Sequence, residues 1–178
     1  MGRGAGGRLR ARSDALIAAG TGHRPDKLGG YGAAADRRLT LFARSVLGVV
    51  RPSGVISGMA LGWDMALAEA ALDLGIPLLA ALPFLGQEAR WPEASQARYR
   101  GLLARTFRVE VVCEDGYSAW KMQARNEWMV DRCHVLLALW DGSSGGTANC
   151  VRYARRVERP RLDLWPLYEK FPGAVPLA

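Results

Sequence analysis

The sequence lacks the features that place a protein in a membrane or send it out of the cell. No apolar run approaches the roughly 18 residues that a membrane-spanning helix needs. The apolar stretch at residues 15–19 is shorter than the hydrophobic region of a signal peptide, and no cleavage pattern follows it. Gly6 stands where an N-myristoylation signal requires Ser or Thr. We therefore expect a cytoplasmic protein with no membrane partner.

Cysteine is also scarce. Cys113, Cys133 and Cys150 are widely spaced, odd in number and form no C-x-x-C pair. This pattern argues against both a disulfide framework and a structural zinc site. We expect three buried thiols in a reducing compartment, no metal site and no required cofactor.

Positive charge is concentrated in two segments. The chain has 24 Lys and Arg against 17 Asp and Glu, a net charge of +7. Four arginines lie in a Gly-rich leader of residues 1–13, and five more lie between residues 152 and 161. The leader has no hydrophobic periodicity, so we expect it to be disordered and residues 14–178 to form a single domain. A solvated basic tail is favoured over a nucleic-acid-binding surface, because no aromatic residues alternate with the arginines of the tail.

Short runs of Val, Ile and Leu alternate with longer segments of helical period, which is typical of repeated β-α units. We predict an α/β fold: a Rossmann-like three-layer sandwich with a mostly parallel sheet of about six strands. The unbroken apolar run Val135–Leu139 indicates a strand covered by helices on both faces. Strands are predicted at Ala15–Thr21, Gly54–Ser57, Pro77–Leu82, Phe107–Val112, His134–Trp140 and Arg161–Trp165, and helices at Asp36–Val50, Trp63–Leu74, Glu93–Arg105, Trp120–Arg132 and Thr147–Val157.

Three predicted strands end in glycine-rich turns, at residues 20–25, 57–64 and 140–147. Glycine lets the backbone approach an oxyanion closely, and the helix that follows adds a partial positive charge. In an open α/β sheet, ligands bind where such loops meet. For these three loops to meet, the first strand must lie between the second and the fifth, with the third and fourth extending outward. Ordinary tight turns are the alternative interpretation.

Polar side chains complete the predicted nucleotide site. Arg24 and Arg125 are the expected phosphate ligands, because a guanidinium binds two oxygens at once; a surface ion pair is the alternative for Arg125. His23 is expected either to donate to the ligand or to brace its own loop. Asp64 is expected either to bond a ribose hydroxyl or to cap the following helix. The full predicted set is Gly20, Thr21, Gly22, His23, Arg24, Ser57, Gly58, Gly62, Asp64, Arg125, Asn126, Asp141, Gly145, Gly146, Thr147 and Asn149.

Aromatic and apolar side chains give two weaker indications. Trp91, Trp128 and Tyr31 are candidates for stacking on a base, although core or dimer contacts are commoner roles. The predicted helix Trp120–Arg132 carries more hydrophobic residues than one buried stripe needs, which indicates a homodimer surface. The residues concerned are Trp120, Met122, Trp128, Met129 and Val130.

Four motifs in order give the chain a family resemblance. They are Gly-Thr-Gly-His-Arg-Pro at 20–25, Ser-Gly-Met-Ala-Leu-Gly-Trp-Asp at 57–64, Lys-Met-Gln-Ala-Arg-Asn-Glu-Trp-Met-Val-Asp at 121–131 and Gly-Gly-Thr-Ala-Asn at 145–149. They resemble the SLOG superfamily, in particular its small stand-alone YpsA-type members. That superfamily includes the Lonely Guy phosphoribohydrolases and the DNA-processing protein of natural transformation. The resemblance implies a Rossmann-like sheet, a nucleotide-type ligand and frequent dimers.

The match to the hydrolases is partial. Arg125 falls at their functional arginine, whereas Cys150 occupies the position of their catalytic glutamate. Cleavage of a glycosidic bond needs a carboxylate, so we expect sensing or sequestration of a nucleoside monophosphate, ADP-ribose or NAD-like molecule. Hydrolysis by a displaced acid is the first alternative, with Arg125, Asp64 and Glu69 as candidate catalytic residues. DNA binding through the basic segments is the second alternative.

Overall fold

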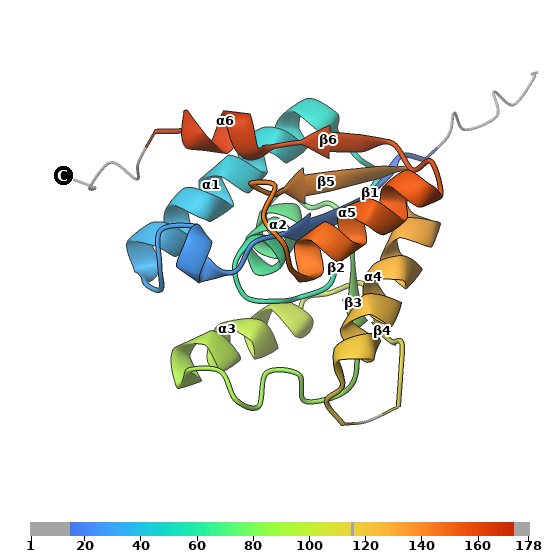
Figure 1. The fold of residues 1–178 in the computed structure, drawn as a ribbon. Helices are drawn as coiled ribbons and strands as arrows, with labels where there is room; N and C mark the ends of the chain where they lie inside the picture. Colours follow the sequence, from blue (N-terminus) through green and yellow to red (C-terminus); the bar gives the residue numbers. More distant parts are fainter. Residues whose placement is uncertain (1–14, 115, 173–178) are drawn as a thin grey trace, which may run out of the picture.

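The computed structural model describes residues 15–114 and 116–172, and Figure 1 shows their arrangement. Six strands, each parallel to its neighbours, form one sheet in the order β4-β3-β2-β1-β5-β6. The predicted α/β fold and the predicted strand order are both confirmed. The strands are β1 (Ile17–Gly22), β2 (Gly54–Ser57), β3 (Leu78–Leu82), β4 (Arg108–Val111), β5 (Val135–Leu139) and β6 (Arg161–Asp163).

Helices cover both faces of the sheet and make the fold three layers thick (Figure 1). The central strand β1 contributes to both interiors, because successive side chains of a strand point to opposite faces. Ala18 packs in the cluster formed with α1, α2 and α3, and Ala19 packs in the cluster formed with α4 and α5. The helices are α1 (Ala33–Val50), α2 (Trp63–Asp73), α3 (Glu93–Leu103), α4 (Ala119–Arg132), α5 (Gly146–Arg156) and α6 (Trp165–Glu169).

Helix α2 is buried almost all round, because it lies between the sheet and α1. Its alanines at positions 66, 68, 70 and 71 are fully buried, and they allow the close approach that this central position requires. A helix that is apolar on every side is expected in such a place. This close packing fixes the beginning of α2 at the carboxyl ends of the strands, where the predicted site lies.

The structure differs from the sequence-based expectations mainly at element ends. The first strand is shifted from Ala15–Thr21 to Ile17–Gly22. The last strand ends at Asp163 rather than Trp165, because Trp165 begins α6, a short helix with proline in its first turn that was not predicted. The basic leader lies outside the described residues. No helix within the described ranges is long and apolar enough to cross a membrane.

The expected dimer surface on α4 is mostly used inside one chain. Met129 and Val130 are buried in the core, and Trp128 packs against that core with Arg132 stacked on its ring. Met122 lines the pocket described below, whereas Trp120 is 62% exposed. Met129 and Val130 are therefore not spare hydrophobic area, contrary to the expectation from the sequence, whereas Met122 and Trp128 are half-buried and Trp120 is exposed.

Candidate functional site

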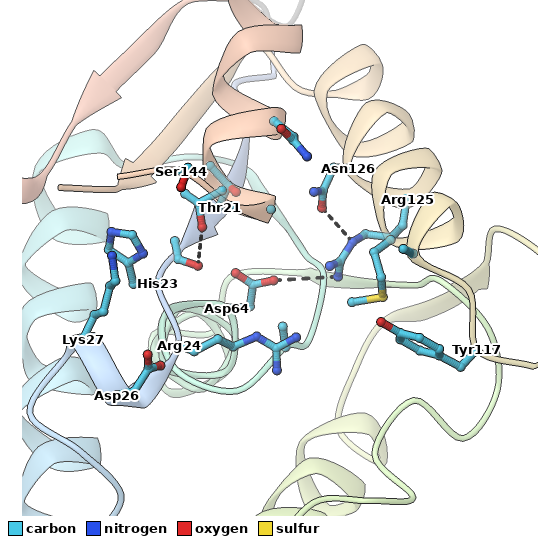
Figure 2. Close-up of a pocket in the computed structure, with 18 residues that line it drawn as sticks. Thr21, His23, Arg24, Asp26, Lys27, Asp64, Tyr117, Arg125, Asn126 and Ser144 are labelled. Atoms are coloured by element: carbon cyan, nitrogen blue, oxygen red, sulfur yellow. Dashed lines mark hydrogen bonds and ion pairs between the residues drawn. The ribbon is translucent and has the colours of Figure 1, made fainter. Parts of the chain in front are cut away.

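A pocket of about 470 Å³ lies at the carboxyl ends of β1 and β5 (Figure 2). Four segments form its wall: the end of β1 with the turn after it, and the beginnings of α2, α4 and α5. Its volume is within the range of small-molecule sites. The predicted residues that line it are Thr21, Gly22, His23, Arg24, Asp64, Arg125, Asn126, Gly145, Gly146, Thr147 and Asn149.

The remaining predicted residues support this pocket from behind rather than line it. Ser57 is fully buried; its hydroxyl donates to Asp64 O at 2.7 Å and accepts the Met59 N–H at 3.1 Å. Ser57 therefore fixes the loop between β2 and α2. Gly20, Gly58, Gly62 and Asp141 likewise do not line the pocket, and each has a structural role that the geometry explains.

The glycines of β1 are required by packing against α2. A Cβ on Gly20 would lie 2.5 Å from Leu67, and one on Gly22 would lie 2.6 Å from Trp63. Gly62 has a φ of +89°, and a Cβ there would lie 2.5 Å from the carbonyl oxygen of His23. These glycines were predicted to let a phosphate approach the backbone. In Gly20, Gly22 and Gly62, however, the hydrogen that a Cβ would replace faces the protein interior.

Arg125 reaches the floor of the pocket from α4 and meets Asp64 of α2. Its Nη1 lies 3.7 Å from Oδ2 of Asp64, and the two side chains are 4% and 8% exposed. Nη1 also donates to the carbonyl of Gly58, so a side chain at position 58 would displace the guanidinium. Nε donates to Oδ1 of Asn126 at 3.0 Å. The alternative of a surface ion pair for Arg125 is therefore wrong.

Asp64 does not cap the helix that contains it. Helix α2 begins at Trp63 with Gly62 before it, and the Asp64 carboxylate instead accepts the N–H of Ala60 in the preceding loop. Burial raises the pKa of Asp64, while the charges of Arg125 and Arg24 oppose that rise. Burial lowers the pKa of Arg125, and Asp64 opposes that change. The pocket floor thus holds one buried carboxyl and one buried guanidinium side by side.

Asp141 ties the loop after β5 to the turn after β1. Its Oδ1 lies 2.7 Å from Nε2 of His23, and its Oδ2 accepts from Nζ of Lys27 at 3.2 Å. Donation from the hydroxyl of Ser143 is the main reason that the pKa of Asp141 lies well below its usual range. His23 thus holds the turn after β1 against the loop after β5, which is one of the two roles expected for it. Lys27, which the sequence analysis missed, lines the pocket beside it.

Three helices begin at the pocket, and none of them has a side-chain cap among the described residues. Gly145 and Gly146 lead into α5, and no described atom lies within 4 Å of where their Cβ atoms would be. The hydroxyl of Thr147 donates to the carbonyl of Gly22 at 3.0 Å and so fixes this helix end against β1. Free N–H groups at helix beginnings attract anions. At the beginning of α5 these groups add to the positive charge of Arg24, Lys27 and Arg125, which outnumber the two carboxylates of the pocket lining, Asp26 and Asp64.

Two residues considered for catalysis lie elsewhere. Cys150 is 1% exposed and packs in the core between β1 and α4, behind Thr21. Burial raises the pKa of its thiol to about 11. Glu69 forms an ion pair with Arg98 and accepts a hydrogen bond from Thr40 at a different surface. The structure therefore does not bring it to the pocket. Residues 15–114 and 116–172 contain no group of three or more His, Cys, Asp or Glu that could hold a metal ion.

Comparison with known families agrees with this geometry. The profile of the YpsA family, described as the YspA SLOG family, matches residues 19–159. The chain belongs to this SLOG family. It is 30% identical over 132 residues to the SPbeta prophage-derived protein YoqJ of Bacillus subtilis, a match that covers 65% of this chain and 77% of YoqJ.

Solved structures with the same fold share little sequence with this family member. DNA processing protein A (DprA) of Streptococcus pneumoniae is similar with a TM-score of 0.61 and 18% identity, over 82% of this chain but only 49% of DprA. The molybdenum cofactor carrier protein of Chlamydomonas reinhardtii is similar with a TM-score of 0.54 and 17% identity, over 89% of this chain and 82% of the carrier. The chain thus spans about half of DprA. These similarities establish the fold.

Proposed function

We propose that the pocket binds a nucleotide-derived small molecule, such as a nucleoside monophosphate, ADP-ribose or an NAD-like dinucleotide. The observation that carries this proposal is the open beginning of α5 at Gly145 and Gly146, in one pocket with the buried Arg125. A phosphate bound there receives N–H donors from the helix and charge from the guanidinium. Arg24 and Lys27 add positive charge at the rim.

Binding without turnover fits the side chains of this pocket. The position that holds the catalytic glutamate in the hydrolases is occupied here by Cys150. Its neutral thiol is buried behind Thr21 and supplies no carboxylate to the pocket. The carboxyl of Asp64 is held by Arg125 and by the N–H of Ala60. We therefore propose a sensor or sequestering module, in keeping with the cofactor-carrying role named for its Chlamydomonas structural neighbour.

Calorimetric titration with AMP, ADP-ribose and NAD tests the proposal directly. At least one of the three should bind the wild type, and mass spectrometry of the denatured, freshly purified protein should identify any ligand that was retained. Arg125→Lys keeps the positive charge but cannot reproduce the two-point contact of a guanidinium, so it should weaken binding. Absence of binding by all three compounds, with no retained phosphate compound, contradicts the proposal.

A second candidate function is N-glycosidic hydrolysis of Lonely Guy type, and Asp64 favours it. Asp64 is a buried carboxyl on the pocket wall with a raised pKa, which is a property of general acids. Chromatography of AMP, CMP, GMP and UMP after long incubation decides between the two functions. Release of free base by the wild type, lost in Asp64→Asn, would replace binding by hydrolysis.

DNA is a third possible partner, and the exposed arginines of α5 are the observation behind it. Arg152, Arg155 and Arg156 lie on the outer side of that helix, and DNA processing is the named role of the similar DprA. Phosphate contacts of this kind give an affinity that falls steeply with salt. Deletion of residues 1–13, which carry four further arginines, should abolish such binding.

We also propose a homodimer, which the family resemblance implies. Trp120 at the beginning of α4 is 62% exposed and is the apolar side chain of that helix most available to a second copy. Light scattering at micromolar concentration should then give twice the monomer mass for the wild type. Trp120→Glu should shift the measured mass toward that of the monomer.

A further inference from the structure

A second cavity of about 370 Å³ opens beside the pocket described above. Its wall comes from the loop between β3 and α3, residues 84–91, and from Gly116 and Tyr117 before α4. Arg24, Tyr117 and Met122 line both cavities, so the two meet at these side chains. Figure 2 shows Tyr117 on the α4 side of the first pocket, across from Arg24. The two cavities are therefore adjacent.

The second cavity has a different chemical character from the first. Its aromatic side chains are Phe84, Trp91 and Tyr117, and its cations are Arg24 and Arg90. Phe84 contacts Tyr117 edge to face, with ring centroids 6.1 Å apart. Tyr117 itself is 77% exposed. An exposed ring beside a cationic pocket gains apolar contact when a flat ligand covers it.

Gln87 holds this wall against its neighbours. Gln87 donates to the carbonyl of Gly58 at 3.3 Å, which joins the wall to the loop that holds Arg125. Oε1 of the same side chain is buried and has no hydrogen-bond partner among the described residues. Nε2 of Gln87 also donates to the hydroxyl of Tyr99 at 3.3 Å, so the cavity wall is held to α3 as well.

We propose that this second cavity, named here the base cavity, binds the heterocyclic base of the ligand whose phosphate lies at the beginning of α5. This inference rests on the proposed function. Stacking on Tyr117 and Trp91 accepts any base, whereas a sugar phosphate without a base leaves the cavity empty. The ligand is then a phosphate and an aromatic heterocycle joined by a sugar, and compounds lacking either end bind weakly.

Titration of AMP and ribose 5-phosphate separates the two cavities. The wild type should bind AMP at least about tenfold more tightly than ribose 5-phosphate, which is the usual size of a base-stacking contribution. Tyr117→Ala should weaken AMP binding by about tenfold and leave ribose 5-phosphate binding unchanged. Tyr31→Ala is the matched control, because Tyr31 is also exposed, at 63%, and lines neither cavity.

Fluorescence gives a second, independent measurement. AMP should change the emission of Trp91, ribose 5-phosphate should not, and Trp91→Phe should remove the AMP signal. Equal affinity for AMP and ribose 5-phosphate in the wild type, or equal weakening of both by Tyr117→Ala, overturns the base cavity and leaves the phosphate pocket intact. Failure of AMP, ADP-ribose, NAD and ribose 5-phosphate alike to bind the wild type overturns the proposed function and this inference together.

Discussion

Arg125 Nη1 lies 3.7 Å from Asp64 Oδ2, and this pair joins two helices from opposite faces of the sheet. Helix α2 carries the aspartate and helix α4 carries the arginine, so the contact crosses the carboxyl edge of the strands. Both side chains are more than nine-tenths buried. A buried ion pair contributes little net stability when intact, but loss of one partner leaves the other charge uncompensated.

Arg125→Met should therefore lower the free energy of unfolding by about 3–5 kcal/mol, the usual cost of an unpaired buried charge. Urea denaturation followed by circular dichroism measures this change. The double variant with Asp64→Asn should recover a substantial part of the loss, because it removes the unpaired carboxylate. Strictly additive effects of the two substitutions would show that the pair is not coupled.

The pH dependence of stability provides a separate test of Asp64. Burial raises its pKa above the ordinary value of 3.8, so the folded protein holds this proton more tightly than the unfolded chain does. Its contribution to stability is complete below pH 3.8 and is lost as the pH rises through the raised pKa. The free energy of unfolding of the wild type, relative to Asp64→Asn, should therefore decline as the pH rises above 3.8. A constant difference would show that the pKa of Asp64 is not raised.

Gly146→Val should abolish phosphate binding without lowering the unfolding temperature. No described atom lies within 4 Å of a Cβ at this position, so the new side chain enters the pocket rather than the core. Gly48→Val in α1 is the matched control, since its Cβ also meets no described atom within 4 Å, far from the pocket. Titration with AMP and thermal denaturation of both variants check the prediction. Wild-type affinity in Gly146→Val would exclude this helix end as the phosphate site.

The three cysteines should differ sharply in reactivity. Burial raises the pKa of Cys133 and of Cys150 to about 11, whereas Cys113 is half-buried. At pH 8, iodoacetamide should modify Cys113 faster than the other two in the folded protein, because the thiolate is the reactive form. All three should react at similar rates in guanidinium chloride. Rapid modification of Cys150 in the folded state would show that the core around it opens.

The sequence predicted the architecture because local signals agree with the global fold. The apolar run of β5 and the glycine-rich ends of β1, β2 and β5 are features of single segments, and together they determined the strand order. The family resemblance and the chemistry of the loops placed Arg125 and Asp64 in one predicted site. Cys133 and Cys150 are buried, as predicted, and Cys113 is only partly so.

Other features depend on contacts between distant segments, which periodicity does not reveal. Lys27 was missed because its partner Asp141 is 114 residues away. Tyr117 lies in a loop whose sequence has no motif. The short helix α6 forms where Tyr168 packs on Phe42 of α1 and donates to the carbonyl of Leu28. None of these contacts leaves a pattern within one segment.

The packing of Gly22 against Trp63 has a consequence for how the protein moves. The His23 N–H donates to Leu139 O at 3.1 Å, and the Trp63 N–H donates to His23 O at 3.3 Å. The indole N–H of Trp63 in turn donates to Leu137 O at 3.2 Å. Because these hydrogen bonds join the pocket floor to the central strand β5, we expect the amides concerned to exchange their hydrogens only when the core opens. For the proposed ligand we therefore expect entry and exit through the mouth of the pocket, between the loops, rather than through its floor.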